Sequence, residues 1–321
     1  MKLISITIPA YNEQENLPVL FERLNGVLAP LQDSYQFECI IFDNGSTDAT
    51  PTVSRKLCES DSRWKYVRYS RNFGGEASML AGLDYASGDA VINLFSDLQD
   101  PPEMIPKFLE IYETGYEVVY GVVRERSDHS WLKSKGARIG YWLIYKLTEC
   151  NIPPSATDFR LLSKKVYVQL RSLREVDRYI RGLTHWIGFK KTGVEFDRAP
   201  RLRGKSEANF IYCIFFTLNA IVSFSGRPLR FAMLFGLSIT SLSMGLALLF
   251  AITHFAHPAG FPNPPPGLTT LVILVLFSLG IQSTFVGVIG EYIGRIYNQG
   301  KGRPIYIVDQ TYGFPSRDIS N

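Results

Sequence analysis

The stretch LISITIPAYNEQENLPVL (3–20) decides the fold, because it places a strand, a polar turn and the start of a helix in direct succession. Residues 3–9 form a short run rich in β-branched side chains, which predicts a strand. A helix-like stretch follows from Glu15 to about Leu28. The same succession recurs along the next hundred or so residues. Such alternation predicts an α/β domain with a mostly parallel sheet that is covered on both faces.

Further apolar runs predict the other strands of this domain. They are 37–42 (FECIIF), 64–69 (WKYVRY), 90–95 (AVINLF) and 117–123 (EVVYGVV), and a helix is expected over 76–86. In open sheets of this kind, ligands bind at the carboxyl ends of the strands. Polar clusters follow three of the predicted strands, at Pro9–Glu13, Asp43–Ser46 and Asp97–Gln99. The sequence therefore predicts a ligand site along this edge of the sheet.

The chemistry of these clusters points to a divalent cation. Asp97 and Gln99 are two residues apart and offer oxygen ligands to Mg²⁺ or Mn²⁺, which usually takes one or two carboxylates together with substrate phosphates. Each cluster also has a structural alternative, since Asp43 suits a helix cap and residues 97–102 suit a turn. The chain has no Gly-x-Gly-x-x-Gly after the first strand and no P-loop, so dinucleotide-binding and ATPase functions lose their main support.

Two uncharged runs, 231–253 and 268–289, predict a hairpin of two transmembrane helices. They are 23 and 22 residues long, and as helices each would reach roughly 33–35 Å at about 1.5 Å per residue. The hydrocarbon core of a bilayer is about 30 Å thick. The connecting loop 254–267 contains no Lys or Arg, whereas basic residues flank both runs on their other sides. By the positive-inside tendency, the loop is extracytoplasmic and both flanks are cytoplasmic.

These patterns divide the chain into six predicted parts. They are a cytoplasmic catalytic domain (1–205), an amphipathic helix in the membrane interface (206–230), a first span (231–253), an extracytoplasmic loop (254–267), a second span (268–289) and a cytoplasmic tail (290–321). No secretory signal precedes the first strand, and the four cysteines form no CxxC pair, which is typical of reduced thiols. The net charge of +4 is too small and too dispersed to indicate a nucleic-acid partner.

Several motifs resemble glycosyltransferase family 2, whose members have a GT-A fold. The matching stretches are IPAYNEQENLP (8–18), IIFDNGSTDAT (40–50), YSRNFGGEASMLAGLDYASGD (69–89), LFSDLQDPPEMIP (94–106), ATDFRLLSKK (156–165), VSFSGRPLRF (222–231) and GEYIGRIYNQGKGRPIYIV (290–308). They resemble most the polyprenyl-phosphate hexosyltransferases, a group that includes bactoprenol glucosyltransferases and dolichol-phosphate mannose synthases. The two-span hairpin is similar to that of the bactoprenol enzymes.

The resemblance implies inverting, metal-dependent transfer of a hexose to a polyprenyl phosphate at the cytoplasmic face of the inner membrane, for modification of a cell-surface glycan. The implied donor is UDP-glucose, and the implied lipid is undecaprenyl phosphate if the source is bacterial. A GDP-mannose transferase, a processive polysaccharide synthase and an inactive donor-binding membrane protein remain alternatives. Two lone spans also leave surface for self-association into a homo-oligomer.

Site residues follow from the same resemblance. The positions that match donor-nucleotide contacts are Pro9, Ala10, Tyr11, Glu13 and Asp43. Asp97 and Gln99 match metal ligands of a D-x-D-x-Q pattern, but its first aspartate is replaced by Phe95. The usual second aspartate after Asp43 is likewise replaced, by Asn44. The first of these departures, at Phe95, removes one expected carboxylate ligand from the metal site.

Asp158, with Asp97, is the implied catalytic residue, although a helix N-cap would also suit Asp158. Because a phosphate nucleophile is largely dianionic near neutral pH, we expect Asp158 to position substrate or metal more than to remove a proton. The cations and loop residues implied for phosphate and acceptor are Arg124, Lys133, Arg160, Arg201, Lys205 and Ser206.

Overall fold

The structure is a computed structural model that describes residues 1–124, 153, 155–173, 175, 179–198, 229, 234–236, 238–239, 241, 245 and 267–314. The chain divides into two compact units. The first comprises residues 1–223 with 303–321, and the second comprises residues 224–302.

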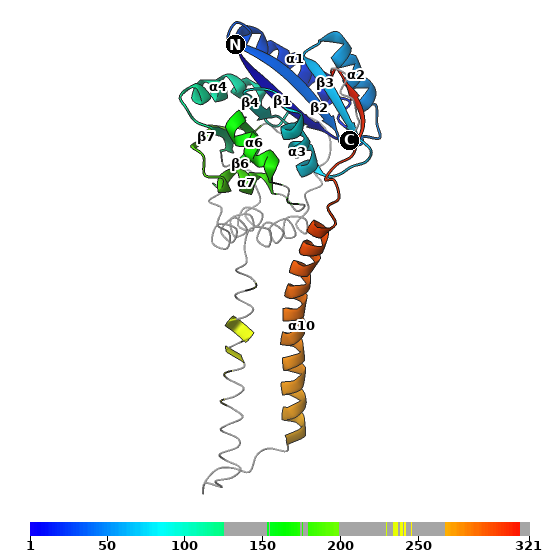
Figure 1. Ribbon diagram of the computed structural model, residues 1–321, viewed down its shortest axis with the longest axis vertical. Coiled ribbons are helices and arrows are strands. Elements are labelled where there is room, and N and C mark those ends of the chain that lie inside the picture. Colours follow the sequence, from blue (N-terminus) through cyan, green and yellow to red (C-terminus); the bar gives the residue numbers. More distant parts are fainter. Residues whose placement is uncertain are drawn as a thin grey trace. The chain divides into compact units, whose positions relative to one another are not determined.

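Within the described residues, the first unit contains an eight-stranded sheet in the order β7-β5-β6-β4-β1-β2-β3-β8 (Figure 1). The strands are β1 (Lys2–Ala10), β2 (Tyr35–Asp43), β3 (Trp64–Tyr69), β4 (Ala90–Asn93), β5 (Val118–Val123), β6 (Ala156–Ser163), β7 (Lys191–Phe196) and β8 (Val308–Tyr312). Strands β6 and β8 run antiparallel to their neighbours, and the other pairings are parallel. The predicted α/β fold with a mostly parallel sheet is confirmed.

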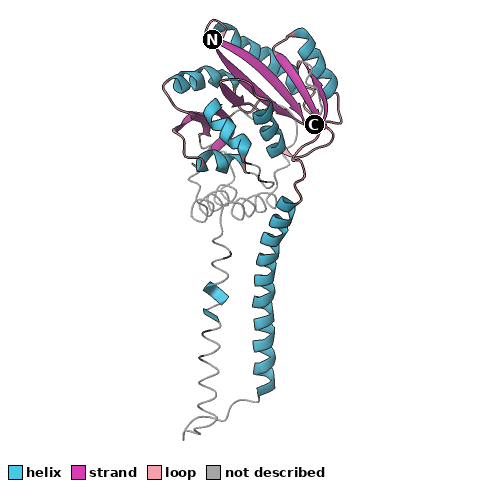
Figure 2. Cartoon of the chain, in the orientation of Figure 1, coloured by secondary structure: helices cyan, strands magenta, loops and turns pink. Residues whose placement is uncertain are grey.

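Helices connect and cover these strands (Figure 2). They are α1 (Asn16–Leu28), α2 (Thr50–Ser60), α3 (Gly75–Tyr85), α4 (Ile105–Glu113), α6 (Lys164–Ser172) and α7 (Ile180–Trp186), with short 3₁₀ turns η1 (Ala29–Leu31) and η2 (Pro102–Met104). The predicted helices at 15–28 and 76–86 agree with α1 and α3 to within one residue.

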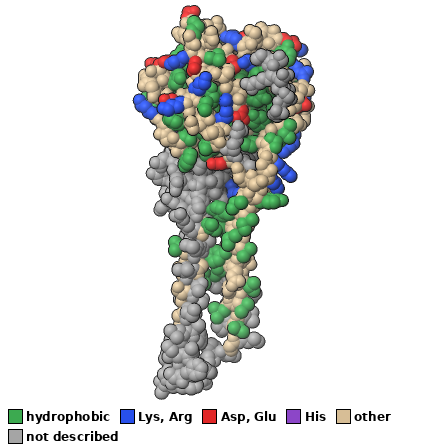
Figure 3. Space-filling model, viewed as in Figure 1, with side chains coloured by type: hydrophobic (Ala, Val, Ile, Leu, Met, Phe, Trp, Pro, Cys, Tyr) green, Lys and Arg blue, Asp and Glu red, His purple; other side chains and the backbone are tan. Residues whose placement is uncertain are grey.

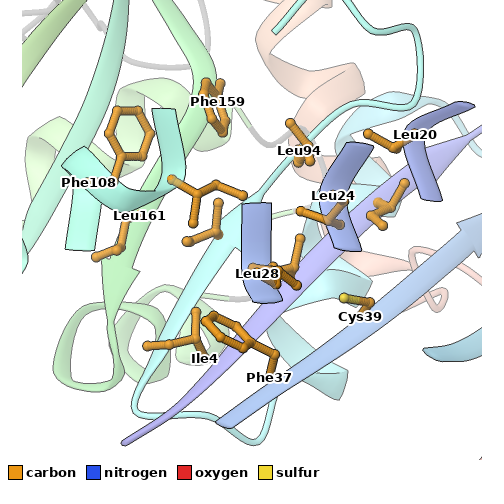
Figure 4. Packing of buried hydrophobic residues seen from close by; sticks show 14 of the residues in the cluster. Ile4, Leu20, Leu24, Leu28, Phe37, Cys39, Leu94, Phe108, Phe159 and Leu161 are labelled. Atoms are coloured by element: carbon orange, nitrogen blue, oxygen red, sulfur yellow. The ribbon is translucent and has the colours of Figure 1, made fainter. Parts of the chain in front are cut away.

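The central strand β1 distributes its side chains between two core layers, because successive residues of a strand point to opposite faces. Ile4, Ile6 and Ile8 pack in one cluster with the leucines of α1. Figure 4 shows Leu20, Leu24 and Leu28 of α1 over Ile4 and the neighbouring strand. On the opposite face, α3 approaches so closely that a Cβ at Gly82 would lie 3.0 Å from Thr7 Cβ. The sheet is therefore covered on both sides, as predicted.

The strands β6, β7 and β8 lay outside the predicted set. β8 is the clearest case, since it lies within the predicted tail (290–321) yet pairs antiparallel with β3. Four of its five residues are exposed, and its sequence, VDQTY, has little apolar content. A short polar edge strand of this kind carries almost no hydrophobic signal, so only its tertiary partner reveals it.

In the second unit, α10 (Gly267–Gly300) includes the predicted second span. Figure 3 shows apolar side chains along this helix, and Leu271, Leu279, Val286 and Ile293 are among the large exposed ones. None of the helices in the described part of the chain combines the length and the apolar character needed to cross a membrane. The predicted interfacial helix, first span and loop (206–267) fall almost wholly outside the described residues.

Candidate active site

The carboxyl ends of β1 and β2 meet, because these strands are parallel partners whose register runs to Ala10 opposite Asp43. The loops that follow are joined by hydrogen bonds. The backbone N–H of Asn12 donates to Ser46 Oγ (2.9 Å), and the N–H of Thr47 donates to Asn12 Oδ1 (2.9 Å). Asn12 has a φ of 55°, a left-handed conformation that asparagine tolerates better than most residues. We call this region the β1–β2 half of the site.

The predicted nucleotide residues lie together in this half but differ in exposure. Tyr11 is 41% exposed, whereas Glu13 is buried and accepts a hydrogen bond from Asn16 Nδ2 (2.5 Å). The carbonyl of Pro9 accepts a hydrogen bond from Ser96 Oγ (2.8 Å), which ties the end of β1 to the segment after β4. Tyr11 is therefore the predicted residue best placed to meet a ligand.

Asp43 is wholly buried at the end of β2, and its carboxylate accepts hydrogen bonds from other residues of the protein. Its Oδ1 accepts the N–H of Ser46 (2.8 Å), and its Oδ2 accepts the hydroxyl of Tyr66 (2.7 Å). Arg68 Nε lies 3.8 Å from Oδ2. Because α2 begins only at Thr50, Asp43 does not cap that helix. Asp43 instead closes the turn after β2 and anchors it to β3.

Asn44 and Gly45 shape the same turn. Asn44 donates through Nδ2 to Asn72 Oδ1 (2.9 Å) and accepts the N–H of Phe73 at Oδ1 (2.8 Å). An aspartate at position 44 could not make the first of these bonds, since it has no donor when ionised. Gly45 has a φ of 71°, and a Cβ there would lie 2.6 Å from the carbonyl carbon of Arg71. The replacement of aspartate by Asn44 therefore serves the packing of two loops.

The segment after β4 holds the predicted metal ligands. Asp97 and Gln99 are both half-buried, and the N–H of Gln99 donates to Asp97 Oδ1 (3.2 Å). Between them, Leu98 is buried in the core and has a φ of 58°, which is strained for a bulky residue. The segment is thus a turn, as the structural alternative proposed. While Leu98 is buried, the side chains of Asp97 and Gln99 on either side of it stay partly exposed, so their oxygens can be reached from the surface.

Phe95 has a packing role at the position of the missing carboxylate. Its half-buried ring packs against Met79 and Leu80 of α3 and against Ile180 at the start of α7. The side chain thus joins two helices and contributes no ligand atom to the predicted metal site.

Asp100 ends this segment and forms a further charged contact. It is completely buried, and Arg198 Nε, two residues beyond β7, lies 3.2 Å from its Oδ1. Burial raises the pKa of Asp100 to about 6, while Arg198 opposes this and Asp97 and Asp158 add to it. The charges of Asp97 and Asp158 therefore both act on the carboxyl group of Asp100.

Asp158 lies inside β6, which excludes the helix N-cap alternative. Arg160 Nη2 lies 2.6 Å from its Oδ1, and Arg181 Nη2, from α7, lies 2.5 Å from its Oδ2. Burial raises the pKa of Asp158, but the two guanidinium groups outweigh it and hold the pKa at about 2. The backbone carbonyl of Asp158 also accepts a hydrogen bond from Asn93 Nδ2 of β4 (3.0 Å). We call Asp97–Asp100 and this cluster the β4–β6 half.

Glu76, in the first turn of α3, belongs to the same half. Its Oε2 accepts the backbone N–H of Ile180 (3.1 Å). Burial raises the pKa of Glu76 to about 7, and the charge of Asp158 adds to this shift, while Arg181 and Arg160 oppose it. Two carboxylates and two guanidinium groups thus meet between α3, β6 and α7.

Comparison with known proteins identifies the family. The model for glycosyl transferase family 2 matches residues 5–171. The chain belongs to glycosyltransferase family 2. It is 39% identical to an uncharacterized glycosyltransferase of Synechocystis sp. over 97% of this chain and 96% of that protein.

Several relatives in this family carry functional names. The chain is 36% identical to the SfII prophage-derived bactoprenol glucosyl transferase of Shigella flexneri, over 96% of this chain and 98% of that protein. It is 37% identical to the bactoprenol glucosyl transferase of Shigella phage SfV, over 95% and 97%. Among solved structures, glucosyl-3-phosphoglycerate synthase of Mycobacterium tuberculosis, in complex with Mn²⁺, UDP and glucosyl-3-phosphoglycerate, aligns with a TM-score of 0.42 and 19% identity over 63% of this chain and 73% of that one.

The predicted cations of this glycosyltransferase are placed unevenly. Arg160 is 3% exposed, and its Nε and Nη1 have no hydrogen-bond partner among the described residues. Together with Asp158 and Asn93 it lines a small pocket. Arg124, at the end of β5, is exposed and lies 3.4 Å from Glu195 and 3.5 Å from Asp197. The remaining four predicted residues lie outside the described part of the chain: Lys133, Arg201, Lys205 and Ser206.

Sequence reasoning missed four charged residues of the site: Glu76, Asp100, Arg181 and Arg198. Asp100 adjoins the predicted ligands, so its proximity was a usable signal. Glu76 lies inside one of the motifs that carried the family resemblance, at the start of a predicted helix. Arg181 and Arg198 come from α7 and from the end of β7, for which no element had been predicted.

Proposed function

We propose that this glycosyltransferase moves a hexose from a nucleotide-diphosphate sugar to a polyprenyl phosphate with inversion at the anomeric carbon. Glucose from UDP-glucose and undecaprenyl phosphate are the favoured substrates. The observation that carries the proposal is the closeness of two groups. Strand β4, which precedes Asp97 and Gln99, pairs with β6, which carries Asp158 and Arg160, and the charges of Asp97 and Asp158 both raise the pKa of Asp100. The near-full-length similarity to proteins named bactoprenol glucosyl transferase supports the choice of acceptor.

The donor nucleotide would occupy the β1–β2 half. Tyr11 presents an exposed ring on which a base can pack, beside the backbone of Pro9 and Ala10. Glu13 and Asp43 are buried and already hydrogen bonded, so we assign them to shaping the surrounding loops. This refines the expectation that Asp43 touches the base or ribose directly.

A Mg²⁺ or Mn²⁺ ion fits the β4–β6 half. Asp97 and Gln99 supply one carboxylate and one amide oxygen, and such ions complete their coordination with diphosphate oxygens and water. The described residues include no group of three or more His, Cys, Asp or Glu that could hold a metal without substrate. When bound, the ion would stabilise the charge that develops on the departing nucleoside diphosphate. The proposed role of Asp97 is thus to hold the ion that stabilises the leaving group.

Asp158 would position the reactants. The acceptor phosphate is largely dianionic near pH 7, because its second pKa is about 6, and it can attack without a strong base. A carboxylate with a pKa of about 2, held by two guanidinium groups, is a poor proton acceptor at that pH. We assign Asp158 to fixing Arg160 and Arg181, whose charge favours the incoming phosphate. A single displacement of this kind inverts the anomeric centre.

We place the reaction at the cytoplasmic face of the inner membrane. The uncharged runs 231–253 and 268–289 support a two-span hairpin with both termini in the cytoplasm. The exposed apolar side chains of α10 favour contact with lipid or with a second copy of the chain. An anchor of this kind suits an acceptor whose isoprenoid tail stays in the bilayer.

The alternative of an inactive donor-binding protein rested on Phe95 and Asn44. Both replacements have packing roles, since Phe95 joins α3 to α7 and Asn44 joins two loops. These roles favour a working site with a reduced ligand set over a decayed one. A transferase specific for GDP-mannose remains the second candidate for the donor.

A donor panel tests the proposal. The purified full-length protein would be mixed with undecaprenyl phosphate and, in turn, UDP-glucose, UDP-galactose, UDP-N-acetylglucosamine and GDP-mannose, with Mn²⁺ or with EDTA. We expect a lipid product whose mass increases by one hexose, only with UDP-glucose and only with metal. A product from GDP-mannose would select the second candidate. No product from any donor would favour the binding protein.

A further inference from the structure

Glu76 provides a helix cap that comes from a different helix. The first N–H groups of any helix lack partners within it, and a nearby carboxylate satisfies them and favours the positive end of the helix dipole. Ile180 is the first residue of α7, and its N–H donates to Glu76 Oε2 across 3.1 Å. Tyr179, the N-cap residue of α7, makes no side-chain cap bond among the described residues. Glu76 therefore pairs one of the N–H groups that the start of α7 leaves without a partner inside the helix.

The capped turn carries the clamp on Asp158. Arg181 directly follows Ile180, and its Nε and Nη2 contact both carboxylate oxygens of Asp158 at 3.2 and 2.5 Å. Consecutive Cα atoms are only about 3.8 Å apart, so a shift of Ile180 would displace Arg181 with it. The hydrogen bond to Glu76 is therefore made one residue away from Arg181, which holds the Asp158 carboxylate together with Arg160.

Apolar packing against α3 also holds the same turn. Ile180 lies in a cluster with Met79 and Leu80 of α3, against which Phe95 packs. We expect this packing to keep α7 attached to α3 in a variant that lacks the hydrogen bond.

We propose that Glu76 is a positioning residue whose hydrogen bond to the Ile180 N–H fixes the first turn of α7, so that Arg181 holds Asp158 in the orientation needed for transfer. This inference rests on the proposed function, since it concerns the role of Asp158 in that reaction. Glu76 need not touch substrate. It acts through Ile180 and Arg181.

A matched pair of variants separates the hydrogen bond from side-chain volume. E76Q keeps an oxygen that can accept the Ile180 N–H, whereas E76M has a similar size and no such acceptor. Leaving the buried N–H of Ile180 without an acceptor costs enough for a loss of about tenfold. We expect E76M to lower kcat by that factor with little change in the donor KM, and E76Q to stay within about threefold of wild type. D84N, at the other end of α3, where Asp84 accepts the hydroxyl of Tyr306, is the control and should be unchanged.

A double variant and amide exchange complete the test. If Glu76 acts through Arg181, R181M should lower kcat further by less than about twofold in the E76M background, because the clamp is already displaced. Amide exchange at Ile180 should accelerate in E76M and not in E76Q. Exchange does not require turnover, so an inactive wild type would refute the proposed function and leave this readout intact.

Several results would overturn the inference. One is an E76M enzyme with wild-type kcat, and another is equal losses in E76Q and E76M, which would assign the effect to charge. Losses that multiply in E76M/R181M would show independent roles. An E76M protein that fails to fold beside a folded E76Q would assign the bond to stability alone.

Discussion

The two halves of the site are built on opposite physical plans. In the β1–β2 half, the buried side chains of Glu13, Asp43 and Asn44 are hydrogen bonded within the protein, and Asp43 has partners on both oxygens. In the β4–β6 half, the charges of Glu76, Asp158, Arg160 and Arg181 are crowded together, and the pKa values of the two carboxylates move in opposite directions. The β1–β2 half therefore has its polar groups satisfied by the protein itself. The β4–β6 half holds a group of buried charges with which a charged substrate can interact.

Removing Asp158 should produce the largest effect. In D158A, the buried guanidinium of Arg160 loses its counter-ion, as does Arg181. Breaking a buried pair from one side costs about 3–5 kcal/mol in the free energy of unfolding. Urea denaturation of D158A and D158N measures this, and D158N should lose less because it keeps an acceptor oxygen. A D158A protein as stable as wild type would show that Asp158 is not needed as a counter-ion for Arg160 and Arg181.

Removing Asp97 should affect activity and leave stability nearly unchanged. Asp97 is half-buried, and its proposed role begins only when metal and donor bind. Loss of electrostatic stabilisation of this kind typically costs about 10²–10³-fold in kcat. Transfer assays of D97A across a Mn²⁺ titration measure the loss, with D33A at an exposed surface position as control. Wild-type kcat in D97A would remove Asp97 from the mechanism.

Changes in the β1–β2 half should lower stability and leave kcat nearly unchanged. Y66F removes the hydroxyl that donates to Asp43 Oδ2 at 2.7 Å, in a wholly buried position. We expect a loss of about 1–3 kcal/mol in the free energy of unfolding, with kcat within about twofold of wild type. Thermal melting and transfer assays on the same sample measure both. A large fall in kcat without destabilisation would erase the contrast between the halves.

A slope of stability with pH should come from Glu76. Its pKa is raised from 4.5 to about 7, so between these values the folded protein binds more protons than the unfolded chain. Stability from this group therefore falls as pH rises from about 4.5 to 7. Asp158 adds no slope between pH 5 and 8, since its pKa is lowered from 3.8 to about 2 and it stays ionised in both states.

E76Q isolates that slope. The difference in melting temperature between E76Q and wild type should shift in favour of E76Q as the buffer moves from pH 5 to pH 8. Other titrating groups are common to both proteins, so their contributions cancel in the difference. A difference that stays constant with pH would show that Glu76 does not retain its proton in the folded state.

Most strands of the α/β domain could be predicted from the sequence, because their hydrophobic signal is strong. β1 to β5 are buried and apolar, and a short apolar run between polar turns is a strong strand signal. The polar clusters after β1, β2 and β4 could be expected to meet, because parallel strands end at one edge. β6 and β7 were missed, since β6 carries Asp158 and Arg160 within it and β7 alternates weakly.

The sequence by itself determined the α/β alternation and the edge of the sheet at which the polar clusters gather, and it put forward Asp97 and Gln99 as candidate ligands. Those features follow from local hydrophobicity and from residue types at fixed spacing. Only the tertiary structure decided that Asp158 is held by two guanidinium groups, that Phe95 packs, and that Glu76 caps α7. These contacts join residues far apart in the chain, and burial together with neighbouring charge sets their pKa values. No local pattern encodes such pairings.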